Sequence, residues 1–112
     1  MGVPGGMPGT AAALVAAVAA LPAGCSWSAT GIGRTSLPVA LAALSAGGHL
    51  RVGMEDTLTF AKGRPVTGND ELVARAADLA RLAQRPPMTT DEARDLLRVK
   101  NRTAPDSTGE PR

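Results

Sequence analysis

Apolar and polar residues follow two different periods along this 112-residue chain, and the first blocks predict a helix and then a strand. Residues 11–21, AAALVAAVAAL, are continuously apolar, follow Thr10 as a good N-cap and stop before Pro22. They therefore predict a buried helix. Residues 25–30, CSWSAT, alternate small and larger side chains, a pattern that predicts a strand.

A second helix and a second strand follow the GIGR segment. The helix is expected from Ser36 or Leu37 to Ala46, because Pro38 is tolerated in a first turn and two glycines follow Ala46. Residues 49–54, HLRVGM, predict the second strand. Residues 55–68 carry several breakers and predict a long connection.

Two more helices are expected in the last third of the chain. Asn69 is expected to cap a helix over residues 70–84, whose apolar stripe consists of Leu72, Val73, Ala76, Leu79, Ala80 and Ala83. Thr89 and Glu92 have the spacing of a capping box, which predicts a short fourth helix. Residues 100–112 are polar and contain proline, so they predict a disordered tail.

The predicted order, α-β-α-β-α-α, indicates an α/β fold with a parallel sheet. Such a sheet needs neighbouring strands and helices on both faces, and two strands cannot supply them. About two strands and four helices are instead a natural part of an eight-stranded TIM (β/α)8 barrel. We therefore expect the chain to be incomplete as a barrel.

The second predicted strand ends in charged residues. Its side chains should alternate, so Arg51 and Glu55 share one face and Leu50 lies on the other. At about 3.3 Å per residue, the backbones of Arg51 and Glu55 would lie roughly 13 Å apart, too far for a simple ion pair. Asp56 would be the first loop residue, at the rim where barrel enzymes keep their chemistry.

Adjacent carboxylates at such a rim suit a metal ligand beside a general base, because a cation offsets their repulsion. The alternative is a solvated strand end stabilised by a salt bridge, since structural ion pairs also cluster charges. The sequence alone leaves both open.

Composition excludes some classes of function. The net charge is +2, and no basic cluster is interleaved with the two aromatic residues, Trp27 and Phe60, so nucleic-acid binding has no support. The single cysteine, Cys25, excludes an internal disulfide and fits a reducing compartment. Because Cys25 begins the first predicted strand, we expect a buried, inert thiol.

Residues 10–25 allow a different interpretation, a small exported or lipid-anchored protein with this stretch as its signal region. The apolar run is too short to span a bilayer, which takes roughly 20 residues, so no membrane association is expected. The residues before it carry no Lys or Arg, and Pro22 does not fit a lipobox. Cleavage before Cys25 would favour the exported protein.

Four segments in order, SWSATGIGR…LP, GGHLRVGMED, AKGRPVTGNDELV and TTDEARDLL, resemble the C-terminal part of the β-keto acid cleavage enzymes. That family includes the 3-keto-5-aminohexanoate cleavage enzyme of lysine fermentation. The resemblance covers residues 1–99. It implies a cytoplasmic, zinc-dependent α/β barrel, homo-oligomeric when intact, that converts a β-keto acid and acetyl-CoA into acyl-CoA and acetoacetate by Claisen-type condensation and its reversal.

The resemblance also implies roles for individual residues. Glu55 matches a zinc ligand, and Arg51 and Asp56 match catalytic residues. The family's other zinc ligands are two histidines, whereas this chain has one histidine, His49, which is not a ligand in that pattern. Since a catalytic zinc needs about three protein ligands, the chain is expected to be inactive alone.

Gly31, Gly33 and Arg34 precede a predicted helix, where backbone N–H groups can bind phosphate. A contact with the phosphate of coenzyme A is the functional interpretation, and a plain tight turn is the alternative. A third hypothesis for the whole chain is a fragment that completes the barrel of another subunit.

Overall fold

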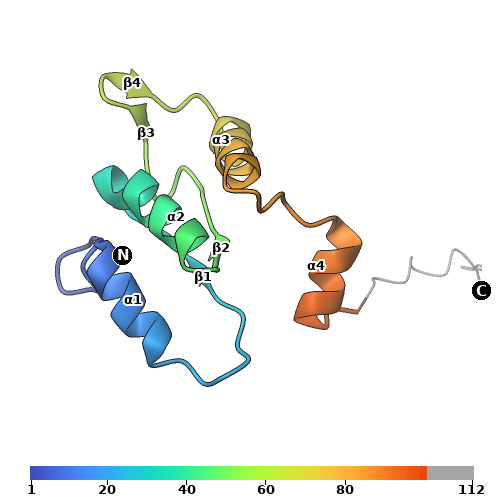
Figure 1. Ribbon diagram of the computed structural model, residues 1–112. Coiled ribbons are helices and arrows are strands. Elements are labelled where there is room, and N and C mark those ends of the chain that lie inside the picture. Colours follow the sequence, from blue (N-terminus) through green and yellow to red (C-terminus); the bar gives the residue numbers. More distant parts are fainter. Residues whose placement is uncertain (101–112) are drawn as a thin grey trace, which may run out of the picture.

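The computed structural model describes residues 1–100 and has an α/β fold (Figure 1). Its elements are α1 (Ala11–Ala19), β1 (Ser28–Ala29), the short 3-10 helix η1 (Gly33–Thr35), α2 (Ser36–Ser45), β2 (His49–Leu50), β3 (Thr59–Ala61), β4 (Arg64–Pro65), α3 (Asn69–Leu82) and α4 (Thr90–Leu97). The four predicted helices are confirmed. The predicted tail, residues 100–112, lies outside the described residues except for Lys100.

Strands β1 and β2 form a parallel pair, in which Ser28 lies opposite His49 and Ala29 opposite Leu50. The first residue of the chain is hydrogen-bonded to the segment that follows β1. The amino group of Met1 donates to the carbonyl of Thr30 at 2.7 Å, and the Met1 carbonyl accepts from the Ile32 N–H at 2.9 Å. These two bonds fix the start of the chain beside the segment after β1.

The core joins one side of this parallel pair to two helices. Its buried members are Leu14 from α1, Ala29 from β1, and Val39 and Ala43 from α2. Leu50 packs against this cluster, which confirms the predicted apolar side for this one residue of the second strand. Alanines at these positions let α2 approach the strands closely, which explains a core made of small side chains.

The sequence predicted that helix α1 is buried, whereas only one side of it is covered. Its Thr10 cap is confirmed, because the Thr10 hydroxyl accepts from the Ala13 N–H at 3.2 Å. Leu14 is its buried residue, whereas Val15 on another side is 59% exposed. An apolar helix with one covered side reads in sequence like a helix covered on all sides.

Both strands of the pair are shorter than predicted. Beyond Leu50 the chain turns, and the N–H groups of Asp56 and Thr57 both donate to the Gly53 carbonyl. Before β1 the chain is irregular, and Cys25 is exposed. The prediction of a buried thiol is therefore wrong, because Cys25 lies in the loop that approaches β1 and not in the strand.

The connection predicted over residues 55–68 contains an antiparallel hairpin, β3–β4. Lys62 and Gly63 form its tip, where Gly63 has φ +74°, a conformation that glycine adopts without strain. The guanidinium of Arg75 donates to the Phe60 carbonyl, which ties the hairpin to α3. Short strands and Pro65 hide this hairpin from a periodicity argument.

The starts of the last two helices differ in how well they were predicted. Helix α4 has the capping box expected from Thr89 and Glu92. Helix α3 begins at Asn69 with Gly68 in the N-cap position, so the assignment of Asn69 as the cap is wrong. The Asn69 side chain instead accepts from the Met54 N–H at 2.8 Å. Within residues 1–100, no helix combines the length and the apolarity that crossing a bilayer requires.

Candidate functional site

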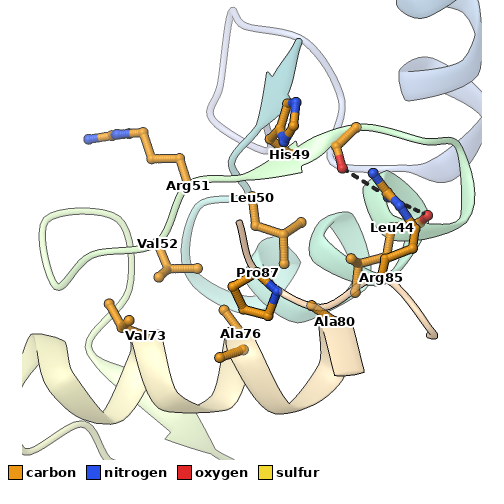
Figure 2. A pocket seen from close by; sticks show the side chains of 12 residues that line it. Leu44, His49, Leu50, Arg51, Val52, Val73, Ala76, Ala80, Arg85 and Pro87 are labelled. Carbon is orange, nitrogen blue, oxygen red and sulfur yellow. Dashed lines mark hydrogen bonds between the residues drawn. The ribbon is translucent and has the colours of Figure 1, made fainter. Parts of the chain in front are cut away.

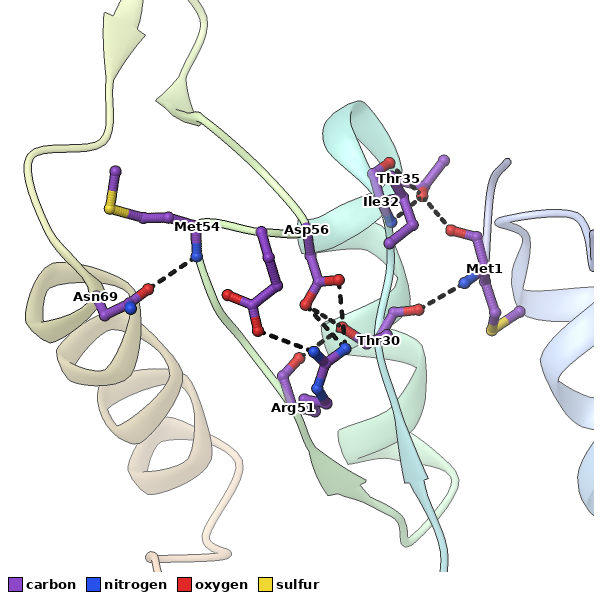
Figure 3. Close-up of polar contacts among 9 residues, drawn as sticks. Met1, Thr30, Ile32, Thr35, Arg51, Met54, Asp56 and Asn69 are labelled. Atoms are coloured by element: carbon purple, nitrogen blue, oxygen red, sulfur yellow. Dashed lines mark hydrogen bonds and ion pairs between the residues drawn. The ribbon is translucent and has the colours of Figure 1, made fainter. Parts of the chain in front are cut away.

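The candidate site lies where β1 and β2 end. The two strands are parallel, so their carboxyl ends meet at one edge. Thr30 follows β1 there, Arg51 follows β2, and the turn over residues 53–56 brings two carboxylates back toward Arg51 (Figure 3). The sequence placed Glu55 and Asp56 at the end of the second strand and Arg51 within that strand, whereas in the structure Arg51 already follows the strand and lies beside both carboxylates.

Arg51 pairs with both carboxylates. One guanidinium nitrogen lies 2.8 Å from Glu55 Oε1, and the other lies 3.0 Å from Asp56 Oδ2 (Figure 3). The expectation that Arg51 and Glu55 are too far apart for an ion pair is therefore wrong. It assumed an extended strand through Glu55, whereas the strand ends at Leu50 and the following turn shortens the separation.

The two carboxylates differ in burial. The side chain of Asp56 is 8% exposed, and that of Glu55 is 59% exposed. A buried carboxylate without a partner is costly, and Arg51 gives Asp56 a charged one. Glu55 faces solvent, where an ion pair contributes little. Of the two carboxylates, Asp56 is therefore the one whose position is fixed by burial and by its pair with Arg51.

Thr30 is a member of this site that sequence reasoning missed. Its hydroxyl lies 2.9 Å from the Arg51 carbonyl and 3.3 Å from Asp56 Oδ2 (Figure 3). The register between β1 and β2 is the feature that could have identified Thr30. Because Ala29 lies opposite Leu50, the next residues, Thr30 and Arg51, must also lie side by side.

The loop after β1 is fastened to the same carboxylate residue. The Gly33 N–H donates to the Asp56 carbonyl at 2.7 Å. Gly31 is buried, and a Cβ added there would lie 2.3 Å from the Thr35 carbonyl oxygen, so the loop needs glycine for this close approach. Gly33 and Arg34 line a cavity of about 440 Å³ beside the site, whereas Gly31 is not in its lining.

Asn69 is the second residue that sequence reasoning missed, since it was assigned only a capping role. Its amide oxygen accepts from the Met54 N–H within the turn that carries Glu55 and Asp56 (Figure 3). The start of α3 thereby fixes this turn. A polar residue at a helix start looks like a cap in sequence, which conceals a contact made outside the helix.

The carboxyl groups with clearly shifted pKa values lie away from this cluster. The Thr89 N–H and hydroxyl lower the pKa of Glu92 in the capping box of α4. The Thr67 N–H, with the nearby Arg64, lowers the pKa of Glu71 at the start of α3. Both shifts follow from helix-start hydrogen bonds, so they stabilise local structure and do not mark a reactive group.

The zinc that the resemblance implies is not matched by a complete set of ligands in this part of the chain. A catalytic zinc takes about three protein ligands. Within residues 1–100, no three His, Cys, Asp or Glu side chains gather closely enough to hold a metal ion. Glu55 is an accessible carboxylate, and it already pairs with Arg51. The described residues therefore do not form a zinc site by themselves.

Curated relatives resemble between 71% and 91% of this chain. Two are 3-keto-5-aminohexanoate cleavage enzymes. The enzyme from Acetoanaerobium sticklandii is 39% identical over a match that covers 88% of this chain and 36% of the relative. The enzyme from Fusobacterium nucleatum is 41% identical over a match that covers 71% of this chain and 29% of the relative. The 3-dehydrocarnitine:acetyl-CoA trimethylamine transferase of Rhizobium meliloti is 34% identical over a match that covers 91% of this chain and 34% of the relative. The chain spans about a third of the length of these relatives.

A family model described as beta-keto acid cleavage enzyme matches residues 1–99. The match includes residues 10–25, so this stretch is part of the family's domain, and the interpretation as an exported or lipid-anchored protein has no support. The same match contains Arg51, Glu55 and Asp56. This chain belongs to the beta-keto acid cleavage enzyme family.

Proposed function

We propose that residues 1–99 are the C-terminal portion of a (β/α)8 barrel, whose complete form is a cytoplasmic homo-oligomeric acyltransferase. The complete enzyme converts a β-keto acid and acetyl-CoA into a new acyl-CoA and acetoacetate. This chain is inactive without the rest of the barrel. Support comes from the family match and from the Rhizobium meliloti relative, whose name includes acetyl-CoA.

An open edge of β2 supports the barrel. The His49 N–H donates to the carbonyl of Trp27, the residue before β1, and the Arg51 N–H donates to the carbonyl of Ala29 in β1. The backbone groups of Leu50 between them therefore face away from β1. In residues 1–100, no strand pairs with that outer edge of β2. An unpaired edge is a surface that a complete fold covers.

An apolar groove beside the open edge of β2 also supports the proposal that the chain is part of a barrel (Figure 2). The groove has a volume of about 520 Å³ and lies between β2 and α3, where its apolar wall includes Leu50, Val52, Val73, Ala76 and Ala80. At one end Arg85 donates to the carbonyls of Leu44 at 2.8 Å and Gly48 at 3.0 Å (Figure 2). An additional strand and its apolar side chains would fill this groove in the complete barrel.

We assign the general base to Asp56. Its carboxylate takes a proton from the carbon between the keto and carboxylate groups of the substrate, and the carbanion attacks the thioester carbonyl of acetyl-CoA with release of the thiolate. The thiolate then adds to the original keto carbon, and the bond between that carbon and its α-carbon breaks. This cleavage gives the new acyl-CoA, and Asp56 returns the proton to acetoacetate.

Arg51 acts as the partner of this base. Its planar guanidinium holds Asp56 and presents further N–H donors to the substrate carboxylate. Glu55, which is exposed at the carboxyl ends of β1 and β2, is assigned as one ligand of a zinc ion whose remaining ligands would lie in the rest of the barrel. The observation that carries the proposal is the nearly buried Asp56 held by Arg51 at the carboxyl ends of parallel strands.

A chimera tests the proposal. Residues 1–99 replace the matched segment of the Acetoanaerobium sticklandii enzyme, and the product is assayed for acetoacetate formed from a β-keto acid and acetyl-CoA. We expect activity from the chimera and none from the 112-residue chain alone. A correctly folded chimera without activity, or turnover by the isolated chain, would contradict the proposal.

A further inference from the structure

We propose that the cavity between the η1–α2 segment and the β3–β4 hairpin binds the phosphate-bearing nucleotide end of the acyl-CoA substrate. The inference rests on the proposed function and adds two residues, Lys62 and Arg75, to a contact considered so far only for the loop after β1. The cavity has a volume of about 440 Å³, within the range of roughly 300–1,000 Å³ typical of small-molecule sites.

The cavity collects positive charge from three separate segments. Arg34 comes from η1, Lys62 from the tip of the hairpin, and Arg75 from the middle of α3. No acidic residue is in the lining, and within residues 1–100 none of these three side chains has a carboxylate within 4.0 Å. Cations gathered in a cavity without nearby carboxylates attract a polyanion.

The remaining wall is largely apolar. Leu37 and Leu58 line it and are 37% and 67% exposed. Phe60 lies beside them, with the guanidinium carbon of Arg75 at 4.4 Å from its ring centre. An apolar wall next to cations suits a ligand that combines a flat base with phosphates, and an inorganic anion would leave the apolar part unused.

The position of the cavity fits the two ends of an acyl-CoA. Its wall includes Thr57, the residue after Asp56, and Gly33, whose N–H donates to the Asp56 carbonyl. A molecule held here by its nucleotide therefore has the proposed general base next to its binding site. The thioester at the other end of an acyl-CoA can then reach Asp56.

Calorimetric titration of the complete 112-residue chain with coenzyme A tests the inference. Lys62 is exposed at the hairpin tip, so Lys62→Glu leaves the core intact. We expect it to weaken the Kd for coenzyme A about 10-fold, equivalent to about 1.4 kcal/mol. Lys100→Glu makes the same change of charge on an exposed residue after α4 and should alter the Kd less than about twofold.

Two probes locate the part of the ligand that binds. Adenosine 3′,5′-bisphosphate should compete with coenzyme A, and pantetheine, which lacks the nucleotide, should not. Equal effects of Lys62→Glu and Lys100→Glu, equal binding of pantetheine and coenzyme A, or no binding of coenzyme A would each overturn the inference.

The chimera separates this inference from the proposed function. We expect Lys62→Glu to raise its KM for acetyl-CoA about 10-fold. An active chimera whose KM does not change would refute the nucleotide site and leave the proposed function standing. Loss of coenzyme A binding in Lys62→Glu, together with an inactive wild-type chimera, would refute the function and leave the site standing.

Discussion

The two ion pairs of Arg51 should differ in their contribution to stability, and this difference tests the geometry of the site. Two double-mutant cycles isolate them, one with Arg51→Met and Asp56→Asn and one with Arg51→Met and Glu55→Gln. Each substitution removes a charge and keeps much of the side-chain volume. The coupling free energy of each pair is the part that the single variants do not explain.

The magnitudes follow from burial. Pairs between exposed side chains couple by about 0.2–1 kcal/mol, and Arg51 and Glu55 are 51% and 59% exposed. Asp56 is 8% exposed, and breaking fully buried pairs costs about 3–5 kcal/mol. Because water still reaches half of Arg51, we expect about 1–2 kcal/mol for the Arg51–Asp56 pair and at most about 0.5 kcal/mol for the Arg51–Glu55 pair.

Urea unfolding of the chain, followed by circular dichroism at 222 nm, measures both couplings, provided that the slope of the transition stays constant among the variants. Raising the salt concentration should weaken the Arg51–Glu55 coupling proportionally more, since screening acts most strongly on exposed charges. Equal couplings, or a larger one for Glu55, would refute the conclusion that the fold holds Asp56 through Arg51.

Three further outcomes are expected. Gly31→Ala should lower the unfolding free energy by about 1–3 kcal/mol in the same urea assay, because its Cβ would lie 2.3 Å from the Thr35 carbonyl oxygen; an unchanged midpoint would contradict the close approach. Arg85→Met should cost about 1–2 kcal/mol through two lost hydrogen bonds, and a neutral effect would argue against them. The pKa of Glu92 is lowered from 4.5, so its stabilisation of α4 is present above pH 4.5 and is lost as the pH falls through the lowered pKa. Titrating the chain with acid while following its helicity should show this loss. A Thr89→Ala variant with the same titration curve would contradict the capping box.

Helices were predictable here where a local signal decides them. Thr10 and the Thr89–Glu92 pair cap their helices as expected, because each cap depends on residues within one turn. Strand ends depend on partners far along the chain. The predicted strand over residues 49–54 stops at Leu50, because the turn after it is fixed partly by Asn69.

Three members of the candidate site could be predicted from the sequence, but its other two members and its geometry could not. The charged residues after an apolar strand pointed to Arg51, Glu55 and Asp56. Their mutual contacts depend on a turn that strand periodicity does not contain. Thr30 was missed because its role depends on the register between β1 and β2, which neither strand encodes alone.

Acetoacetate formation by the chimera that carries Asp56→Asn tests the central claim most directly. The account predicts that this variant lowers kcat by about 10²- to 10⁴-fold, the usual contribution of a general base. Asp95→Asn, which makes the same chemical change at an exposed position in α4, should retain the activity of the wild-type chimera. Undiminished turnover in the Asp56→Asn chimera would contradict the assignment of the reacting carboxylate.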